Sequence, residues 1–502
     1  MHADGQVTPR PTLGRRLLLI WLVTFAVGLV GLDARATYGA RVSADEPQYL
    51  MTALSLAEDF DLDVSDEIEE ELYLPFHEIG LNTQTIDLDD DGQRISPHDP
   101  LLPLVLAPAM GLGGWAAAKA MLAAIAGLTA VATAWVAVRR FGITVGTATV
   151  GTIALFANPP LTAYATQVYP EMPAALATII GLGAVLGIQR NPGDGDGRIP
   201  VGPVVVAVLA IIALPWLSVK YVPVAGVIGL GLLLRLDRIE RRAAVRTTAV
   251  LAVSGALYLL LHQRIYGGWT VYAAGDHFVD GEFLVVGSNP DYFGRSRRLA
   301  GLLIGRFFGL APWAPVYLLL PAAVGAFARR GREVILALAV LATGWGVATW
   351  IALTMHGWWW PGRQVVVVLP VAVIAMLALV DGRPRRLIAA GALSLLGVVN
   401  WWWLAWEAST DRRTIIVDFF ETEALPYRIL SPIFPDHANY DVIDVVVTVV
   451  WTVAILATVV AGWRQATPPS LPDQQPGRDE DRPGEDQEAL ASAVPEGDLP
   501  SR

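Results

Sequence analysis

The run 364-QVVVVLPVAVIAMLALV-380 is followed directly by the basic stretch 381-DGRPRR-386. The run carries no charged residue. Because a helix rises 1.5 Å per residue, it covers most of a hydrocarbon layer roughly 30 Å thick. Arginine and lysine concentrate at the cytoplasmic ends of membrane helices. Together the two stretches predict a helix that crosses a membrane and ends at the cytoplasm.

Similar apolar runs recur along the whole chain. Hydrophobic residues make up 54% of the sequence and charged residues 17%, with a mean hydropathy of +0.48, which is unusual for a soluble domain. We therefore predict an all-α polytopic membrane protein with about 12 transmembrane helices in the domain 17–463. The expected spans lie near 17–32, 115–138, 143–158, 172–188, 201–217, 219–234, 247–262, 301–327, 333–353, 364–380, 387–404 and 443–463.

Arginine clusters fall at every second boundary between these runs, which predicts that both termini are cytoplasmic and that the chain is a multi-pass protein of the cell membrane. The clusters are Arg139-Arg140, Arg190 with Arg198, Arg235 to Arg246, Arg329 to Arg332, Arg383 to Arg386, and Arg464. The intervening boundaries are then external. They are 33–114, 159–171, the turn around 218, 263–300, 354–363 and 405–442.

The first external loop, 33–114, is long and acidic, with 18 Asp and Glu against three Arg between Asp33 and Asp99. Its segment 97–114 is apolar but rich in Pro and Gly, and a further span there would break the alternation of charge. We expect juxtamembrane or re-entrant helices in this loop. The cytoplasmic N-terminus is 1–16, and the tail 464–502 has the acidic, Pro-rich composition of a disordered segment. The net charge of −11 argues against nucleic-acid binding, and the lack of cysteine excludes disulfides.

Four short external motifs carry the unusual residues: 43-SADEPQY-49, 169-YPEMP-173, 215-PWLSVKY-221 and 356-HGWWWPGRQ-364. Ionisable residues at membrane boundaries are costly and commonly mark a site. Each motif also has a structural interpretation. Trp and Tyr form interfacial belts, Lys220 can snorkel, and Asp45, Glu46 or Glu171 can cap a helix. The convergence of all four on one face favours a functional site.

The arrangement resembles the GT-C superfamily of membrane glycosyltransferases, which use polyprenyl-phosphate sugars and include protein O-mannosyltransferases and aminoarabinose transferases. The likeness covers about 15–463. Asp45-Glu46-Pro47-x-Tyr49 looks like the carboxylate motif of the first external loop in that superfamily. Tyr169-Pro170-Glu171 and Pro361-Gly362-Arg363 are similar to motifs of glycosyltransferase-like bacterial members. No clear soluble C-terminal domain follows, so the resemblance does not identify the acceptor class.

The resemblance implies transfer of a sugar from a polyprenyl-phosphate-linked donor to a hydroxyl of a glycan, lipid or protein acceptor at the external face. Asp45 would be the catalytic base, and Glu46 would orient the acceptor or replace Asp45. Lys220 and Arg363 would bind the donor phosphate. The residues expected to bind sugar or acceptor are Tyr49, His98, Tyr169, Glu171, His356 and Trp359.

No cofactor is required for this chemistry, and no residue is assigned as a metal ligand, although a divalent cation is compatible with the acidic run from Glu58 to Glu71. The stretch Asp87 to Gly92 opens like a calcium loop, but its twelfth position is His98 instead of Glu. The main alternative function is a transporter or lipid flippase, and a second is a non-catalytic scaffold. Transporters place ionisable residues near the membrane midplane, whereas here they gather at one boundary, which favours an enzyme.

Overall fold

The chain is helical throughout the residues that the computed structural model describes, which are 13–87, 92–189, 199–274, 291–352 and 354–465. Within these residues the only β pairing consists of isolated bridges, such as Ile86 with Ile95. Most of the expected cytoplasmic N-terminus and nearly all of the expected disordered tail lie outside the described residues.

In the part of the chain that the structure describes, eight helices are long and apolar enough to cross a membrane. Four of them consist of an α-helix and an adjoining tighter or wider turn. Leu29–Gly31 follows α1 (Leu13–Gly28), Val219–Tyr221 precedes α8 (Val222–Ile239), Val347–Ile351 follows α14 (Glu333–Gly346), and Arg363–Val368 precedes α15 (Leu369–Val380). The eight are Leu13–Gly31 (with α1, Leu13–Gly28), α4 (Leu101–Phe141), Val219–Ile239 (with α8), α9 (Arg241–Tyr266), Glu333–Ile351 (with α14), Arg363–Val380 (with α15), α16 (Pro384–Ser409) and α18 (Val442–Gln465).

Four shorter apolar helices complete the set: α5 (Val145–Phe156), α6 (Glu171–Leu186), α7 (Val201–Leu217) and Pro315–Phe327, which contains α13 (Leu320–Phe327). All four coincide with apolar runs in the sequence. The protein is therefore a polytopic, all-helical membrane protein, as expected.

Helix α4 is two helices joined at Gly113 and Gly114. Gly114 has φ +61° and ψ −157°, a conformation that only glycine adopts readily. The first part, 101–112, corresponds to the Pro-rich segment that the sequence separates from the span beginning at 115. Because the backbone is non-helical at the two glycines, the 41 residues of α4 do not form one continuous span.

The expected continuous span over 301–327 is wrong in its first half. The structure divides this run into α11 (Arg298–Ile304), α12 (Leu310–Trp313) and Pro315–Phe327. Gly305 ends α11, and Pro315 lacks the N–H that would continue the helix from α12. The remaining short helices are α2 (Glu46–Glu58) and α3 (Ser65–Glu69) in the first loop, α10 (Tyr292–Arg295) and α17 (Leu425–Leu430).

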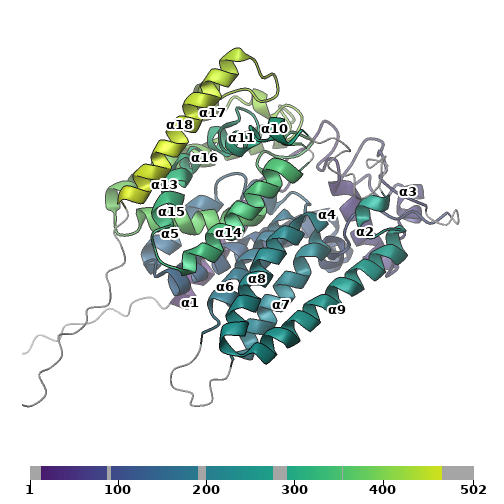
Figure 1. Cartoon of the computed structure of the whole chain (residues 1–502). Helices are drawn as coiled ribbons and strands as arrows, with labels where there is room; N and C mark the ends of the chain where they lie inside the picture. Colours follow the sequence, from purple (N-terminus) through teal and green to yellow (C-terminus); the bar gives the residue numbers. More distant parts are fainter. Residues whose placement is uncertain (1–12, 88–91, 190–198, 275–290, 353, 466–502) are drawn as a thin grey trace, which may run out of the picture. The chain divides into compact units, whose positions relative to one another are not determined.

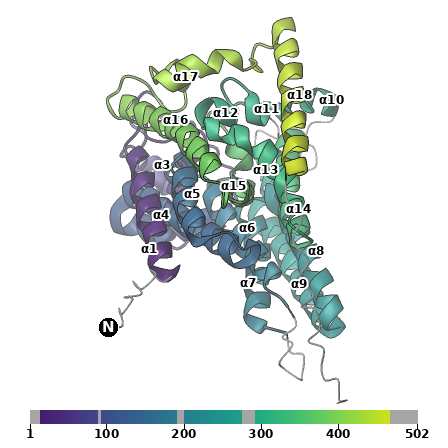
Figure 2. The ribbon, with the colours of Figure 1, turned by 90° about the vertical axis from the view of Figure 1, so that its left-hand side faces the viewer.

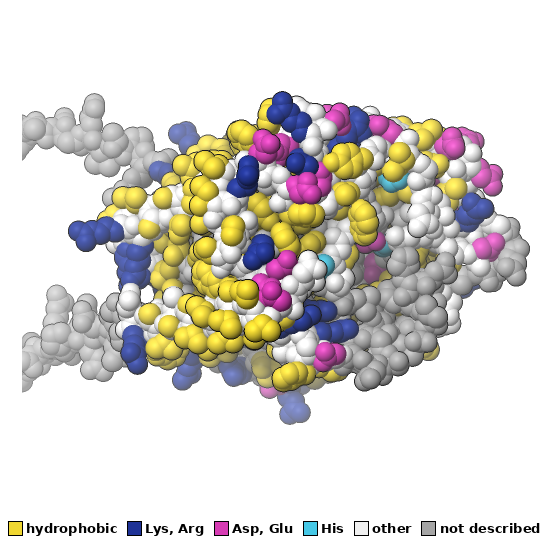
Figure 3. Space-filling view, turned by 90° about the horizontal axis from the view of Figure 1, so that it is seen from above, with side chains coloured by type: hydrophobic (Ala, Val, Ile, Leu, Met, Phe, Trp, Pro, Cys, Tyr) yellow, Lys and Arg dark blue, Asp and Glu magenta, His cyan; other side chains and the backbone are white. Residues whose placement is uncertain are grey.

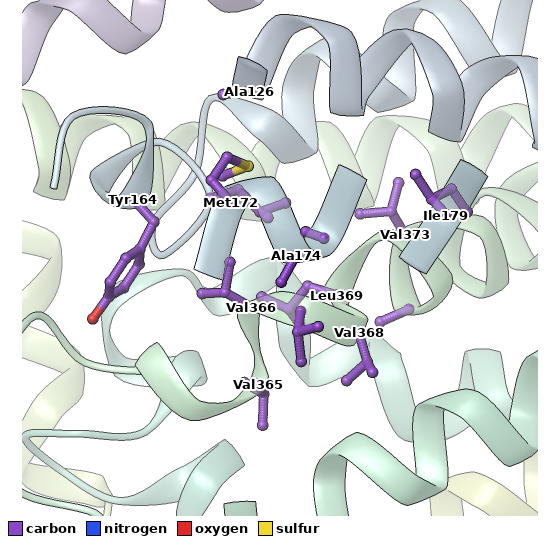
Figure 4. Close-up of a cluster of buried hydrophobic side chains, with 14 of the residues drawn as sticks. Ala126, Tyr164, Met172, Ala174, Ile179, Val365, Val366, Val368, Leu369 and Val373 are labelled. Atoms are coloured by element: carbon purple, nitrogen blue, oxygen red, sulfur yellow. The ribbon is translucent and has the colours of Figure 1, made fainter. Parts of the chain in front are cut away.

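The centre of the helical core is built by α6 and by the helix from Arg363 to Val380. In the apolar window of the latter, 94% of the residues are buried. Figure 4 shows Ala174 and Ile179 of α6 close to Val366, Leu369 and Val373. Such dense packing leaves little freedom for the first residues of either helix, which are Glu171 and Arg363.

Around this core, α7, α8 and α9 lie side by side, and α13 packs along α18 (Figures 1 and 2). The second contact is very close, because a side chain at Gly325 would meet the carbonyl oxygen of Val459, and one at Gly462 would meet that of Ala322. Small residues that let helix backbones approach are typical of packing inside membranes.

The boundaries with Arg clusters contact one another, and we call this group the arginine end. Arg235 forms an ion pair with Glu333, and Thr144 donates to Asp381 at 2.6 Å. Further contacts of this end are Arg140 to Gly183, Arg235 to Ile188, Arg329 to Trp463, Arg330 to Ala378, and Arg386 to Gln465. In Figure 3, Lys and Arg but not Asp or Glu colour the left-hand edge, whereas both kinds of charged side chain lie in the centre and to the right.

Candidate active site

Arg363 and Asp45 meet although they are far apart in the sequence. Asp45 directly precedes α2, and Arg363 follows Gly362, which has φ +82°. The guanidinium of Arg363 donates from Nη2 to Asp45 Oδ2 at 3.2 Å. Arg363 is only 7% exposed, so this ion pair is formed in a largely desolvated environment, where electrostatic interactions are strong.

Glu171 links Arg363 to the lysine of the external turn. Its Oε1 accepts from Arg363 Nε at 2.8 Å and from Lys220 Nζ at 2.7 Å. Glu171 is 1% exposed and is the first residue of α6. The four residues Asp45, Glu171, Lys220 and Arg363, which we call the charge network, balance two negative charges with two positive ones.

Aromatic rings fix the orientation of the guanidinium. Its carbon lies 3.7 Å from the ring centre of Tyr169 and 5.0 Å from that of Trp359. Tyr169 is fully buried, and its hydroxyl donates to the backbone oxygen of Ser43 at 3.4 Å. The cation–π contacts and this hydrogen bond therefore connect Arg363, the segment just before α6 and the first loop.

A cavity of about 170 Å³ lies against the charge network. Three members of the network line it, namely Asp45, Lys220 and Arg363. His98 and Tyr49 also line it, with His98 Nε2 3.9 Å from Asp45 Oδ1 and the two rings 4.6 Å apart. The remaining lining residues are Gln84, Pro97, Asp99, Pro170, Ser218, Val271 and Tyr272.

The lining residues come from five of the six boundaries that the sequence places outside the cell, and we call this group the cavity end. These five are 33–114, 159–171, the turn around 218, 263–300 and 354–363. The sixth, 405–442, contacts the first loop, since Arg35 N donates to Ala408 O and Tyr38 donates to Asp418. Within each of the two groups that the arginine alternation defines, boundaries far apart in the sequence thus contact one another.

The two neighbouring carboxyl groups Asp45 and Glu46 have opposite electrostatic environments. Burial alone would raise the pKa of Asp45, but the positive charges of Arg363, His98 and Lys220 hold it below its usual value. Burial raises the pKa of Glu46 to about 7, although the positive charge of Lys119 acts in the opposite direction. Near neutral pH, Asp45 is ionised and Glu46 is not fully ionised.

Not every residue expected at the site reaches the cavity. Glu46 is 1% exposed and does not line the cavity. Its Oε2 accepts a hydrogen bond from the backbone N–H of Ser43. Glu171, Tyr169 and Trp359 lie behind Arg363, which they contact. His356 does not line the cavity and packs on Phe308, with ring centres 4.8 Å apart.

The sequence analysis missed Asp99 as a member of the site. Asp99 Oδ1 accepts from Tyr258 at 3.0 Å and lies 3.0 Å from His262 Nε2, while Oδ2 accepts from the backbone N–H of Val219 at 3.1 Å. Through Val219, Asp99 holds the turn that carries Lys220. The one feature of the sequence that points to Asp99 is its position next to His98, a predicted site residue. No nearby motif distinguishes Tyr258 or His262 within their apolar helix.

Protein cations already neutralise Asp45 and Glu171, so the charge network needs no metal to balance it. In the described part of the chain, one group of three carboxylates has atoms close enough to share a metal ion: Asp59, Asp66 and Glu67. It falls in the acidic run where the sequence allows a divalent cation. The calcium-like stretch cannot be compared, because residues 88–91 lie outside the described residues.

No protein-family model matches the chain, and no curated protein matches its sequence. Among solved structures, the crystal structure of ArnT from Cupriavidus metallidurans in the apo state aligns with 90% of this chain and 74% of ArnT, with a TM-score of 0.51. The fold is similar to that of ArnT. Sequence identity over the alignment is 17%, so the similarity concerns the fold alone.

ArnT bound to undecaprenyl phosphate has also been crystallised, and this chain aligns with it at a TM-score of 0.49 and 17% identity, over 90% of this chain and 75% of ArnT. The alignment with the apo structure supports the fold that the motif resemblance implies.

Proposed function

We propose that this protein is a membrane glycosyltransferase that moves a sugar from a polyprenyl-phosphate-linked donor to an acceptor hydroxyl. The observation that carries the proposal is the cavity lined by an ionised Asp and by two cations, Lys220 and Arg363. A fold similar to that of ArnT supports the same class of reaction. A base beside phosphate-binding cations is the combination that such a transfer requires.

Asp45 is proposed as the catalytic base. The acceptor oxygen attacks the anomeric carbon, its proton passes to a carboxylate oxygen of Asp45, and the bond from the anomeric carbon to the donor phosphate breaks. The side chain of Asp45 is 26% exposed and lines the cavity, whereas Glu46 is buried. Because its pKa is held low, Asp45 is available in the proton-accepting form throughout the physiological range.

Lys220 and Arg363 are proposed to bind the phosphate that leaves as polyprenyl phosphate. An ammonium has three N–H donors and a guanidinium has five, so each can serve a phosphate while keeping its bond to Glu171. Glu171 is a positioning residue in this scheme, because it holds both cations and does not line the cavity. Negative charge that develops on the phosphate is stabilised by cations already in place.

The cavity is proposed to hold the sugar and the reacting phosphate, with Tyr49 and His98 contacting sugar or acceptor hydroxyls. Its volume of about 170 Å³ is smaller than the roughly 300–1,000 Å³ of pockets that enclose whole drug-sized ligands. The prenyl chain would therefore extend outside it. We propose that His356 does not contact the sugar in this arrangement and that no cofactor is required.

We propose that the eight long and four shorter apolar helices provide 12 spans, with the cavity end outside the cell and both termini in the cytoplasm. The absence of cysteine makes a labelling test simple. A cysteine at the exposed Glu69 should react with a membrane-impermeant maleimide applied to intact cells, whereas one at the exposed Arg385 should react only after lysis. The reverse pattern would contradict the orientation.

The functional test uses the purified full chain with a series of radiolabelled polyprenyl-phosphate sugars in lipid vesicles. The expected result is release of free polyprenyl phosphate together with labelled acceptor. Solute uptake or donor translocation without cleavage of the sugar–phosphate bond would instead support a transporter or flippase.

A further inference from the structure

A second group of carboxylates lies at the other end of the helix that begins beside Asp45. Asp59 directly follows α2, and Asp66 and Glu67 are in the first turn of α3. One carboxylate oxygen from each of the three lies within 4.8 Å of the others. Oxygen atoms on opposite sides of a calcium ion are separated by about the same distance, since Ca–O bonds are roughly 2.3–2.6 Å long.

Glu67 is the unusual member of this group because it is buried without a partner. It is 1% exposed, and neither carboxylate oxygen accepts a hydrogen bond within the described residues. The neighbouring Asp63, in contrast, has hydrogen-bond donors for its carboxylate. Its Oδ1 accepts from the backbone N–H of Ser65, from the Ser65 hydroxyl and from the backbone N–H of Arg94. A buried carboxylate beside two other acidic groups is costly unless it takes up a proton or binds a cation.

We propose that Asp59, Asp66 and Glu67 bind a divalent cation of the calcium class. Carboxylate oxygens are ligands of hard cations, and two of the three side chains are exposed, which leaves room for water ligands. Ca²⁺ accepts irregular geometry from such flexible groups, whereas Mg²⁺ requires a near-ideal octahedron. The carboxyl end of α2 adds a favourable negative potential at the same place.

The cation would join the end of α2 to the start of α3 and so stabilise the first loop. It would lie about 20 Å along α2 from Asp45, since α2 has 13 residues, and would take no part in sugar transfer. The inference is therefore independent of the proposed enzymatic activity.

The test measures calcium binding by isothermal titration and by thermal unfolding, with the purified full chain stripped by EDTA and titrated with CaCl₂. We expect saturable binding and an upward shift of the unfolding temperature. Glu67→Gln should weaken calcium affinity by at least about tenfold and should lose the shift. Without calcium, this variant should be at least as stable as the wild type, because it removes an unpaired buried carboxylate.

Glu70→Gln is the matched control, because Glu70 is an exposed acid that follows the same short helix and does not belong to the group. It should bind calcium like the wild type. The inference is overturned if the wild type shows no saturable response, or if Glu67→Gln binds calcium as the wild type does. Equal affinity for MgCl₂ would overturn the assignment to the calcium class.

Discussion

Arg363, at the cavity end, has different partners from three of the arginines at the arginine end. At the arginine end, Arg140, Arg329 and Arg330 donate to backbone carbonyl oxygens of neighbouring helices. At the cavity end, Arg363 is buried, stacks on Tyr169 and is bonded to two carboxylates. Residues of one type thus act as helix-end anchors on one side and as part of a charge network on the other.

Residue type alone therefore does not identify a functional arginine. The burial of the arginine and the charge of its partner distinguish an arginine of the candidate site from one that only holds a helix end. An arginine that donates only to backbone carbonyl oxygens leaves no carboxylate uncompensated when it is replaced. Removal of a buried guanidinium between two carboxylates leaves both charges poorly compensated, which is costly. Substitutions at matched residues of the two ends should therefore have very different effects.

The largest effect is expected for Asp45→Asn, which removes the proposed base but keeps the shape of the side chain. Sugar transfer should fall by about 10²–10⁴-fold, the usual contribution of general base catalysis. Radiolabelled transfer measured at saturating donor is the assay. Asp237→Asn, at an exposed position of α8 near the arginine end, should keep full activity. Equal activity of the two variants would remove Asp45 from the mechanism.

Arg363→Ala should raise the apparent KM for the donor by about 10–100-fold, because a charge-assisted contact to phosphate is lost. Titration of the donor at fixed acceptor measures this effect. Arg363→Lys should recover part of the affinity, since it keeps the charge without the fork. Arg385→Ala, which removes an exposed arginine at the arginine end, should leave the KM unchanged. An unchanged donor KM in both alanine variants would count against phosphate binding by Arg363.

Glu171→Gln should lower stability by roughly 3 kcal/mol, since it leaves the buried Arg363 and the half-buried Lys220 beside each other with less compensation. Unfolding by denaturant in lipid nanodiscs measures the loss. Glu240→Gln is the control, because Glu240 is exposed at the arginine end. If Glu171→Gln were as stable as this control, the charge network would not hold the core together.

The smallest effect concerns the pH dependence of stability. Because burial raises the pKa of Glu46 in the folded protein to about 7, the stability from this group is greatest below its unfolded pKa near 4.5 and is lost as pH rises toward 7. Glu46→Gln should remove this dependence and raise the unfolding temperature at pH 8 by about 3 °C relative to the wild type. Identical pH profiles of the two proteins would show that Glu46 does not titrate in this range.

The sequence alone predicts most of the helical architecture. Uncharged runs such as 364–380 mark helices through their length and hydropathy, and the arginine clusters separate the two ends. The run 301–327 was misjudged because hydropathy does not register the backbone breaks at Gly305 and Pro315. The break in α4 was anticipated from the Pro and Gly content of 97–114.

For the site, the sequence identified the charged members but not their geometry. Asp45, Lys220 and Arg363 were selected because charge at a membrane boundary is unusual, and all three line the cavity. Asp99 was missed because its partners Tyr258 and His262 lie far along the chain in an apolar helix. His356 was expected at the site because of its neighbours in the Trp-rich motif, although nothing local shows which way a loop side chain points.

A structure of the protein with polyprenyl phosphate bound would test the proposed phosphate site without any assumption about the sugar. We expect phosphate density within hydrogen-bond distance of both Lys220 and Arg363, with the carboxylate of Asp45 facing the same cavity. Density for the phosphate at any other place, with the cavity beside Asp45 empty, would contradict it.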